Sequence, residues 1–320
     1  MHRVLLFAGT PYAIYSYGVM LVTAMVVGML LLARRAPRFG LDAQQALDLA
    51  VTIMLGTICG ARIAIVLTHP GAFAGHLNQI FDLRGGGLSW HGALCGGVAA
   101  YAFYCWKIRP PSRGALLDLM TPPLIVAHII GRIGCFLNGC CVGRPTSVPW
   151  AVTFPDAPEY GGIPRHPVQL YEAAGCLLIL FVVTRLERRN AVASHVASHV
   201  ASHAASQRPS QTAPGTSPGT SAGALTTTPR TSRELLPPGA LFCAYLIGYA
   251  VLRFIDEFYR AEPLLAGGLD LAQYASLILL ATSLWSLHRL RSQHRLRPPY
   301  IVPEAGGSIS TAREISPVGG

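Results

Sequence analysis

Seven long stretches with almost no charged side chains constrain the fold of this chain more than any other feature. They cover residues 13–33, 46–67, 88–106, 115–137, 168–186, 237–256 and 270–288. About 20 apolar residues in a helix cross roughly 30 Å of hydrocarbon. Only 12% of the 320 residues are charged, against roughly 25% in typical soluble domains. The sequence therefore predicts an all-α, polytopic membrane protein with about seven transmembrane helices.

The basic residues are distributed unevenly between these stretches. Clusters follow the first, third, fifth and seventh stretches: Arg34, Arg35, Arg38, Lys107, Arg109, Arg113, Arg185, Arg188, Arg189, Arg289, Arg291, Arg295 and Arg297. Loops that stay in the cytoplasm carry an excess of Lys and Arg. The pattern therefore predicts that the N-terminus lies outside and the C-terminus inside. It also accounts for the net charge of +10, so nucleic acid is not expected as a partner.

Composition divides the chain into four parts. Residues 1–189 hold the first five predicted transmembrane helices and the outer-face site discussed below, and residues 236–291 hold the last two. The intervening residues 190–235 are mostly Ser, Thr, Ala, Pro and Gly, with a repeated Val-Ala-Ser-His unit. Such a composition buries too little apolar surface to offset the entropy lost on ordering. We expect 190–235 to be a disordered cytoplasmic linker and 292–320 a loose cytoplasmic tail.

Ionisable side chains gather near one end of the predicted helices. Within a membrane span such groups cost about 2.5–3.5 kcal/mol each at mid-helix, so they are candidates for function. Under the topology above, these residues share the outer side: His91, Arg132, His166, Gln169, Tyr171, Glu172, Arg253, Asp256, Glu257 and Arg260. They come from four separate helices, and scattered structural ion pairs have no reason to share a depth. The sequence therefore predicts one polar site at the outer face.

The sixth predicted helix ends in a stripe of alternating charge. Arg253, Asp256, Glu257 and Arg260 follow the spacing i, i+3, i+4 and i+7, which puts them on one helix face. They can form a salt-bridge ladder at the membrane interface, or the carboxylates can hold the guanidinium groups ready for a phosphate. Arginine suits the second role because its planar donors bind phosphate bidentately. Arg132 and Arg253 would then form a two-arginine clamp.

Six sequence motifs occur in order along the chain. They are Tyr-Gly-Val-Met (17–20), Gly-Ala-Arg-Ile (60–63), Gly-Gly-Leu-Ser-Trp-His-Gly (86–92), Gly-Arg-x-Gly-x-Phe-x-Asn-Gly (131–139) with Gly143, His-Pro-x-Gln-Leu-Tyr-Glu (166–172) and Arg-Phe-x-x-Glu-Phe-x-Arg (253–260). Together they resemble the motifs of the bacterial prolipoprotein diacylglyceryl transferase family, although any one alone is weak. The resemblance implies seven transmembrane helices with the N-terminus outside, in agreement with the charge pattern.

The resemblance implies a lipid transfer reaction in the bacterial inner membrane. The family moves a diacylglyceryl group from phosphatidylglycerol to the lipobox cysteine thiol of a prolipoprotein, and glycerol phosphate leaves. The expected partners are phosphatidylglycerol, prolipoprotein signal peptides and membrane lipids. No cofactor and no metal are expected. A transporter or receptor is the alternative class for seven helices with an outward polar pocket, but the chain shows no internal repeat of the kind many transporters have.

The chemistry of this reaction suggests roles for the motif residues. A free thiol has a pKa near 8.5, so a general base helps to form the thiolate, and His91 is the candidate. Arg132 and Arg253 match the family's essential arginines and would stabilise the phosphate leaving group. The residues expected to bind the substrate are Arg132, Tyr17, Asn138, Gly143, His166, Tyr171, Glu257 and Arg260.

Cysteines interrupt the fourth motif. Cys135 stands where the family signature has Asn, Cys140 stands where it has Glu, and Cys141 follows. They can be small replacements in an active enzyme, the sign of a different thiol or acceptor chemistry, or the mark of an inactive relative. A disulfide from Cys135 to one of the other two is conceivable at the oxidising outer face. Metal binding with His91 or His166 is another alternative, although Cys-x4-Cys-Cys is not a typical zinc spacing. We expect the thiols to be free or redox-labile.

Overall fold

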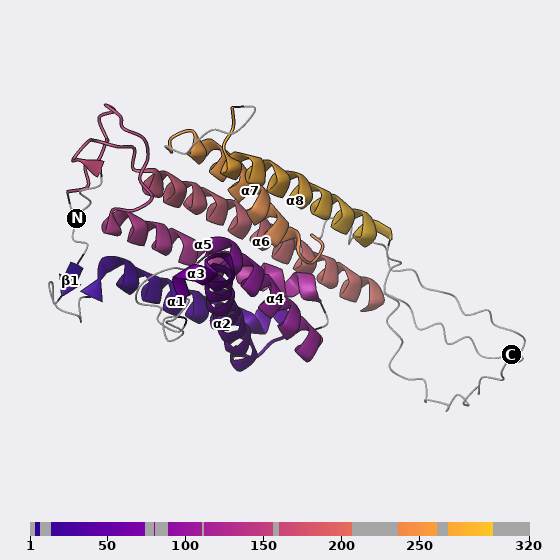
Figure 1. Ribbon diagram of the computed structural model, residues 1–320. Helices are drawn as coiled ribbons and strands as arrows, with labels where there is room; N and C mark the ends of the chain where they lie inside the picture. Colours follow the sequence, from indigo (N-terminus) through magenta and orange to yellow (C-terminus); the bar gives the residue numbers. More distant parts are fainter. Residues whose placement is uncertain are drawn as a thin grey trace, which may run out of the picture.

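A computed structural model describes residues 4–6, 14–73, 80, 89–110, 112–155, 160–206, 236–260 and 268–296. These residues form a bundle of long helices (Figure 1). The seven helices of 18 or more residues in this part of the chain are α1 (Ser16–Arg35), α2 (Ala43–Thr68), α4 (Trp90–Ile108), α5 (Arg113–Asn138), α6 (Val168–Ser206), α7 (Ala240–Glu257) and α8 (Leu271–Leu296). The shorter elements are the antiparallel strands β1 (Val4–Leu6) and β2 (Ile14–Tyr15), the 3-10 helix η1 (Ala36–Phe39) and α3 (Pro70–Phe73).

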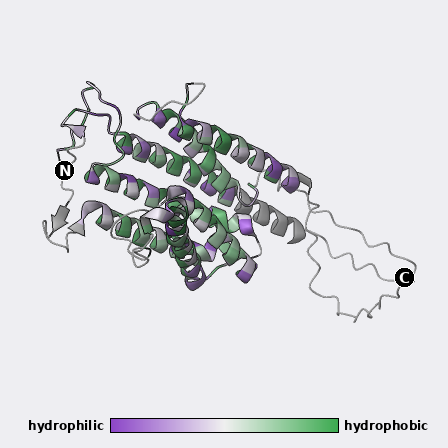
Figure 2. Cartoon of the chain, in the orientation of Figure 1, coloured by the Kyte–Doolittle hydropathy of each residue, from purple (hydrophilic) through white to green (hydrophobic). Residues whose placement is uncertain are grey.

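Each predicted apolar stretch coincides with one long helix, so the helical prediction is confirmed, with the small β1–β2 hairpin as an exception. In the part of the chain that the structure describes, four segments are long and apolar enough to cross a membrane: Ser16–Phe39, Ala43–Thr68, Arg113–Asn138 and Val168–Val192. Apolar residues dominate the helices, as Figure 2 shows, and large ones lie on the outside. Val22 is 60% exposed, Leu67 73% and Ile278 65%. Soluble proteins rarely expose extended apolar surfaces, so this is a membrane protein.

Five of the long helices, α1, α5, α6, α7 and α8, pack against one another in sequence, and α2 and α4 form a pair beside them. α5 lies between α1 and α6, α7 packs on α5, α6 and α8, and the α2–α4 pair adjoins α1 (Figure 1). One apolar cluster joins α5, α6 and α7; it contains Ile125, Ile129, Ala173, Cys176, Ile179, Val183, Leu241 and Tyr245. This core fixes the three helices that carry most of the polar site.

Glycines allow α2 and α4 to approach closely. Gly56 and Gly60 of α2 face Gly92 and Gly96 of α4, with the four-residue spacing of small residues that is common in membrane helix pairs. A Cβ atom at Gly96 would overlap the carbonyl oxygen of Gly56, and one at Gly60 would overlap that of Gly92. The backbones are therefore in direct contact. This contact holds the start of α4, where His91 precedes Gly92.

Two consecutive prolines lie inside α5 and change its hydrogen bonding. Proline has no N–H, so Pro123 cannot donate to the carbonyl oxygen of Leu119, four residues earlier. That oxygen accepts a hydrogen bond from Nε of Arg35 instead, at 3.3 Å. The other guanidinium nitrogens of Arg35 donate to the Glu187 carboxylate at 2.8 and 3.1 Å. Arg35 therefore connects α1, α5 and α6 at the end opposite the polar site.

A buried carboxylate at the same end has a structural role. Asp118 on α5 accepts hydrogen bonds from the backbone N–H groups of Gly239 at 2.7 Å and Phe242 at 3.0 Å. Gly239 is the N-cap of α7 and has no side chain to satisfy these donors. Asp118 therefore caps α7 from a neighbouring helix.

The structure differs from the predicted division of the chain at two boundaries. α6 continues beyond 189 to Ser206, so the first part of the predicted linker is helical. The repeat there is rich in alanine, which has the highest helix propensity, and it directly continues an established helix. The rest of the predicted linker, 207–235, lies outside the described residues. α8 likewise extends to Leu296, and 297–320 is not described.

Candidate active site

A fully buried carboxylate from α6 joins partners from α5 and α7. Oε1 of Glu172 lies 2.8 Å from Nη2 of Arg132 and 3.1 Å from Nε2 of His128, and the hydroxyl of Tyr249 donates to it at 3.3 Å. Oε2 lies 3.5 Å from Nη2 of Arg260. A buried charge is costly unless it is paired and hydrogen-bonded. Glu172 is therefore the centre of a network that connects three helices.

The charged stripe on α7 extends this network. Nη2 of Arg253 lies 2.7 Å from Oε2 of Glu257, and Nη1 lies 3.6 Å from Oδ2 of Asp256. Nε of Arg260, just after α7, lies 3.6 Å from Asp256 and 3.9 Å from Glu257. The predicted stripe is confirmed. Because Arg260 also reaches Glu172, it links the α7 stripe to the α5–α6 part of the site.

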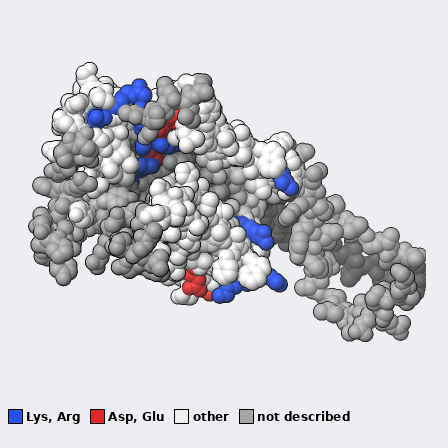
Figure 3. Space-filling model, in the orientation of Figure 1, with Lys and Arg blue, Asp and Glu red and all other residues white. Residues whose placement is uncertain are grey.

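The arginines of the network are more accessible than its carboxylates. The side chains of Arg132 and Arg253 are each 19% exposed, whereas those of Glu172, Asp256 and Glu257 are exposed by 1% or less. Figure 3 shows basic and acidic atoms together in a hollow of the face in view. Nη1 of Arg253 is itself buried and makes no hydrogen bond within the described residues, so the exposed part of this side chain lies at its other atoms. An approaching anion therefore meets guanidinium groups that are held by carboxylates behind them.

Aromatic residues form one edge of the site. Nδ1 of His166 lies 3.1 Å from the hydroxyl oxygen of Tyr171, which also accepts a hydrogen bond from Nε1 of Trp150 at 2.6 Å. The ring of Tyr259 packs edge-on against both His166 and Tyr171. Burial and the nearby charge of Arg144 lower the pKa of His166. His166 is therefore neutral near pH 7 and serves as a hydrogen-bonding partner within this cluster.

Gly143 lies where three segments meet. Its N–H donates to the carbonyl oxygen of His166 at 3.0 Å. A Cβ atom at this position would lie 2.5 Å from Cγ2 of Val168 and 2.7 Å from the carbonyl oxygen of Tyr259. Glycine is therefore needed for the chain to pass between the start of α6 and the end of α7. The structure gives this predicted substrate-binding residue a packing role.

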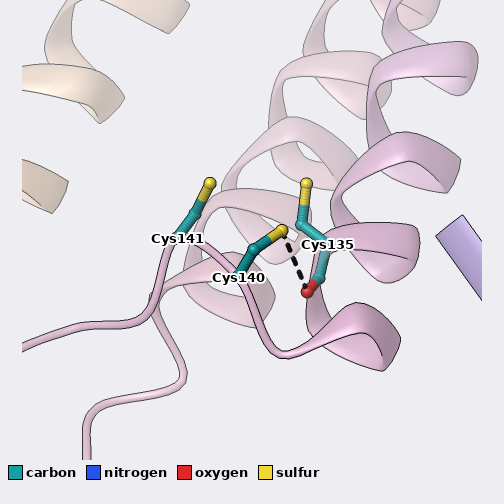
Figure 4. A group of neighbouring side chains, drawn as sticks. All are labelled: Cys135, Cys140 and Cys141. Atoms are coloured by element: carbon teal, nitrogen blue, oxygen red, sulfur yellow. Dashed lines mark hydrogen bonds between the residues drawn. The ribbon is translucent and has the colours of Figure 1, made fainter. Parts of the chain in front are cut away.

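The three cysteines converge just beyond α5. The helix ends at Asn138, and Gly139 takes a left-handed conformation with φ of 70°, as expected for a glycine after a helix. The chain then turns back, so the N–H of Cys140 donates to the carbonyl oxygen of Cys135 at 3.1 Å. The sulfur atoms of Cys135, Cys140 and Cys141 all lie within 4.8 Å of one another (Figure 4). All three are free thiols.

Two further predicted residues lie beside this cysteine cluster. Asn138 interacts with the thiol of Cys140. The ring of Tyr17, at the start of α1, lies against Gly134, with Cδ2 at 3.6 Å from the position a Cβ atom would take there. Hydrogen bonds from the neighbouring thiols of Cys135 and Cys140, together with the charges of Arg132 and Arg260, lower the pKa of Cys141.

His91 lies apart from these contacts. Its side chain is exposed at the start of α4, and its ring meets that of Trp90 edge-on at 5.5 Å. Among the residues that the structure describes, no hydrogen bond or ion pair connects His91 to the arginine–carboxylate network. Its assignment as the general base stays a prediction.

The sequence matches the prolipoprotein diacylglyceryl transferase family over residues 3–204 and 222–289. The chain belongs to this family. A relative from Azoarcus sp. is 32% identical over 86% of this chain and 89% of its own length. A relative from Aromatoleum aromaticum is 31% identical over 89% and 94%, and one from Thermosynechococcus vestitus is 28% identical over 90% and 92%. All three bear the name phosphatidylglycerol–prolipoprotein diacylglyceryl transferase.

In this member of the transferase family, sequence reasoning missed several site residues. Glu172 was included in the predicted polar site but was given no role of its own, and His128 and Tyr249 were not considered. Each of the latter two stands four residues before a predicted arginine, His128 before Arg132 and Tyr249 before Arg253. That spacing puts each pair on one helix face. A search for polar residues one turn from each arginine would have found both.

Proposed function

We propose that this protein transfers a diacylglyceryl group from phosphatidylglycerol to a cysteine thiol of a prolipoprotein, as the names of its relatives describe. The observation that carries the proposal is the pair of accessible arginines, Arg132 and Arg253, backed by buried carboxylates. Phosphatidylglycerol carries its charge on a phosphodiester, and bidentate guanidinium groups suit phosphate oxygens. Family membership supplies the acceptor and the reaction type.

In the proposed reaction, the thiolate sulfur attacks the glycerol carbon that carries the phosphate ester. A C–S bond forms, the C–O bond breaks, and its electrons leave with the phosphate oxygen as glycerol phosphate. Negative charge therefore grows on the phosphate as the bond breaks. Arg132 and Arg253 stabilise that charge, and the carboxylates hold the guanidinium groups in place beforehand, so little reorganisation is required.

His91 is our candidate to accept the thiol proton. Among the described histidines near this end of the helices, His128 contacts the buried Glu172, His166 is hydrogen-bonded to Tyr171, and Nδ1 of His69 lies 2.9 Å from the hydroxyl oxygen of Thr68. His91 is exposed and has no hydrogen-bond partner in the described part of the chain. An exposed imidazole nitrogen without a hydrogen-bond partner is free to accept the proton of a thiol brought beside it.

We propose the remaining substrate contacts on the same basis. Tyr17, Asn138, His166 and Tyr171 line the approach to the arginines, where the lipid and the prolipoprotein signal peptide bind. Glu257 holds Arg253, and Arg260 binds the same carboxylates that hold Arg132 and Arg253, which are Glu172 and Glu257. Gly143 keeps the segment after α5 in place.

We further propose that all seven long helices cross the bacterial inner membrane, with the N-terminus outside and the C-terminus inside. Arg113 and Asn138 stand at opposite ends of α5. The basic cluster around Arg35 contacts Leu119, near the Arg113 end, whereas Arg132 lies near the Asn138 end. The positive-inside rule then puts the basic end in the cytoplasm and the arginine–carboxylate network at the outer face. The linker and the tail are cytoplasmic.

A reconstituted assay tests the proposed reaction. The purified protein is incubated with phosphatidylglycerol and a synthetic prolipoprotein peptide that carries a single cysteine. We expect mass spectrometry to find the diacylglyceryl thioether and free glycerol phosphate in equal amounts. Arg185→Ala serves as the control, because this exposed arginine lies far along α6 and contacts only the ring of Phe181 among the described residues. If correctly folded protein forms no thioether, the proposed reaction is wrong.

A further inference from the structure

We propose that Cys135, Cys140 and Cys141 bind a thiophilic d10 metal ion, such as Zn²⁺ or Cu⁺, through their three sulfur atoms. In Figure 4 the thiols of Cys135 and Cys141 point to the same side, and that of Cys140 lies between them. All three sulfur atoms lie within 4.8 Å of one another. Three sulfur atoms bound to one ion at about 2.3 Å lie roughly 4 Å apart. A contraction of less than about 1 Å would therefore complete the site.

The backbone around the thiols is held in place before any ion binds. Gly139 reverses the chain after α5, and the N–H of Cys140 is bonded to the carbonyl oxygen of Cys135. The buried side chain of Gln169 donates to the carbonyl oxygen of Cys140 at 2.6 Å. Cys141 has a φ of 58°, a left-handed conformation that is uncommon outside glycine. The end of α5 and the constrained loop after it thus direct three sulfur ligands toward one point.

The surroundings suit the charge of such a site. Three thiolates with one Zn²⁺ carry a net charge of −1, and with Cu⁺ they carry −2; the thiol protons are released on binding. Arg132 and Arg260 interact electrostatically with Cys141, and their positive charges offset this excess. Thiolate donors select Zn²⁺ and Cu⁺ over harder ions. Zn²⁺ would take water as its fourth ligand, whereas three sulfur atoms suffice for Cu⁺.

A metal ion at this site would connect the end of α5, which carries Arg132, to the loop that follows it. Cys135 is on the same helix as Arg132 and nearly one turn after it, whereas Cys140 and Cys141 belong to the loop. A bound ion therefore ties the end of α5 to the loop that leads to α6. This stabilises the folded protein, since binding to the native state alone shifts the unfolding equilibrium. The inference does not depend on the proposed transfer reaction.

Metal titration of the full-length, reduced protein in detergent tests the site. The probes are Cd²⁺, which gives an ultraviolet thiolate charge-transfer band, Zn²⁺ and Cu⁺; elemental analysis of the protein as purified identifies the native ion. We expect one ion per chain, a higher melting temperature when it is bound, and protection of three thiols from alkylation. The exposed Cys95 on α4 provides the matched control, and Cys95→Ser should bind as the wild type does.

Single variants decide whether these thiols are the ligands. Cys135→Ser, Cys140→Ser and Cys141→Ser should each weaken binding by at least the roughly 10- to 100-fold seen when a ligand loses its hydrogen-bond partner. Three separate variants keep the test valid if one fails to fold. Equal affinity in the wild type and in all folded variants would overturn the proposal. So would a disulfide among the three in protein purified without reductant, combined with no metal binding after reduction.

Discussion

At the residue scale, the site is built on carboxylates that never reach the surface. Glu172 is fully buried and has four polar partners, and Glu257 and Asp256 are buried equally well behind Arg253 and Arg260. From the sequence, the charged residues were correctly expected at one end of the helices, because such groups are rare in membrane spans. The central position of Glu172 could not be predicted, since it depends on how α5, α6 and α7 pack.

Replacing Glu172 tests this central role. Glu172→Gln removes the charge that pairs with Arg132 and Arg260, and removing one partner of a buried ion pair typically costs about 3–5 kcal/mol. We expect the free energy of unfolding in detergent to fall by a comparable amount. Asp48→Asn is the control, because Asp48 is exposed and surface charges contribute little. A stability equal to that of the wild type would mean that Glu172 is not charged in the folded protein.

If Arg253 is part of the proposed arginine clamp, a lysine at this position should not replace it fully, because lysine keeps the charge but not the planar geometry. Arg253→Ala should lower the rate of diacylglyceryl transfer by about 10²–10³, the usual effect of removing a preorganised donor to a developing charge. Arg253→Lys should recover only part of the loss, because an ammonium group does not reproduce the planar fork that contacts Glu257. The rates are measured at saturating peptide, with Arg185→Ala beside them. Full activity in Arg253→Lys would show that a point charge is enough.

The cysteines permit a test that separates metal binding from transfer. The double variant Cys135→Asn, Cys140→Glu restores the residues that the family signature has at these positions. We expect it to keep or increase transfer activity and to lose the metal ion, because two of three ligands are gone. Both properties are measured on the same preparation. Loss of transfer in a folded double variant would instead indicate that the thiols take part in the reaction.

At the element scale, the apolar stretches predicted the long helices well, and the remaining structure depends on tertiary contacts. The convergence of the thiols needs the left-handed turn at Gly139, which shifts residues 140 and 141 off the helical path. Strand β1 precedes the first apolar stretch and β2 lies at its start, and this strand pair was not anticipated. α5 contains Pro122 and Pro123 yet remains one helix, and Nε of Arg35 from α1 donates to one carbonyl oxygen that the prolines leave without its usual helical donor.

The contact between α2 and α4 provides a prediction at this scale. Gly96→Ala adds a Cβ atom that overlaps the carbonyl oxygen of Gly56. Forcing extra atoms into a packed contact typically costs about 1–3 kcal/mol, and we expect unfolding in detergent to show a loss of this size. Gly18→Ala is the matched control, because a Cβ atom there meets nothing within 4 Å. Equal stability of the two variants would mean that the helices can separate without cost.

At the scale of the whole molecule, one end of the bundle is basic and the other holds the arginine–carboxylate network. The charge pattern alone predicted this arrangement, because the positive-inside rule acts on loops irrespective of the contacts between helices. The way in which Arg35 joins α1, α5 and α6 at the basic end required the folded structure. The gathering of basic residues at one end of the bundle is thus predictable from sequence, whereas the contacts between the helices at that end are not.

Thiol labelling of intact cells tests the orientation. Single cysteines are introduced at two exposed positions, Gln44→Cys at the basic end and Ser147→Cys in the loop after α5, with the native cysteines replaced by serine. A membrane-impermeant reagent should label position 147 in intact spheroplasts and position 44 only after permeabilisation. Labelling of position 44 in sealed spheroplasts would reverse the proposed topology.

The balance of charge in the site determines how a lipid reaches it. Three guanidinium groups and three carboxylates lie together in the network, so much of their charge is offset within it. A cluster of paired opposite charges exerts a weaker long-range pull on an anion than the single-sign clefts that accelerate encounters in solution. Phosphatidylglycerol would therefore arrive by random lateral diffusion in its leaflet, and capture would begin only when its headgroup touches the arginines. Arrival rates set in this way should depend more on the fraction of anionic lipid in the membrane than on the ionic strength of the medium.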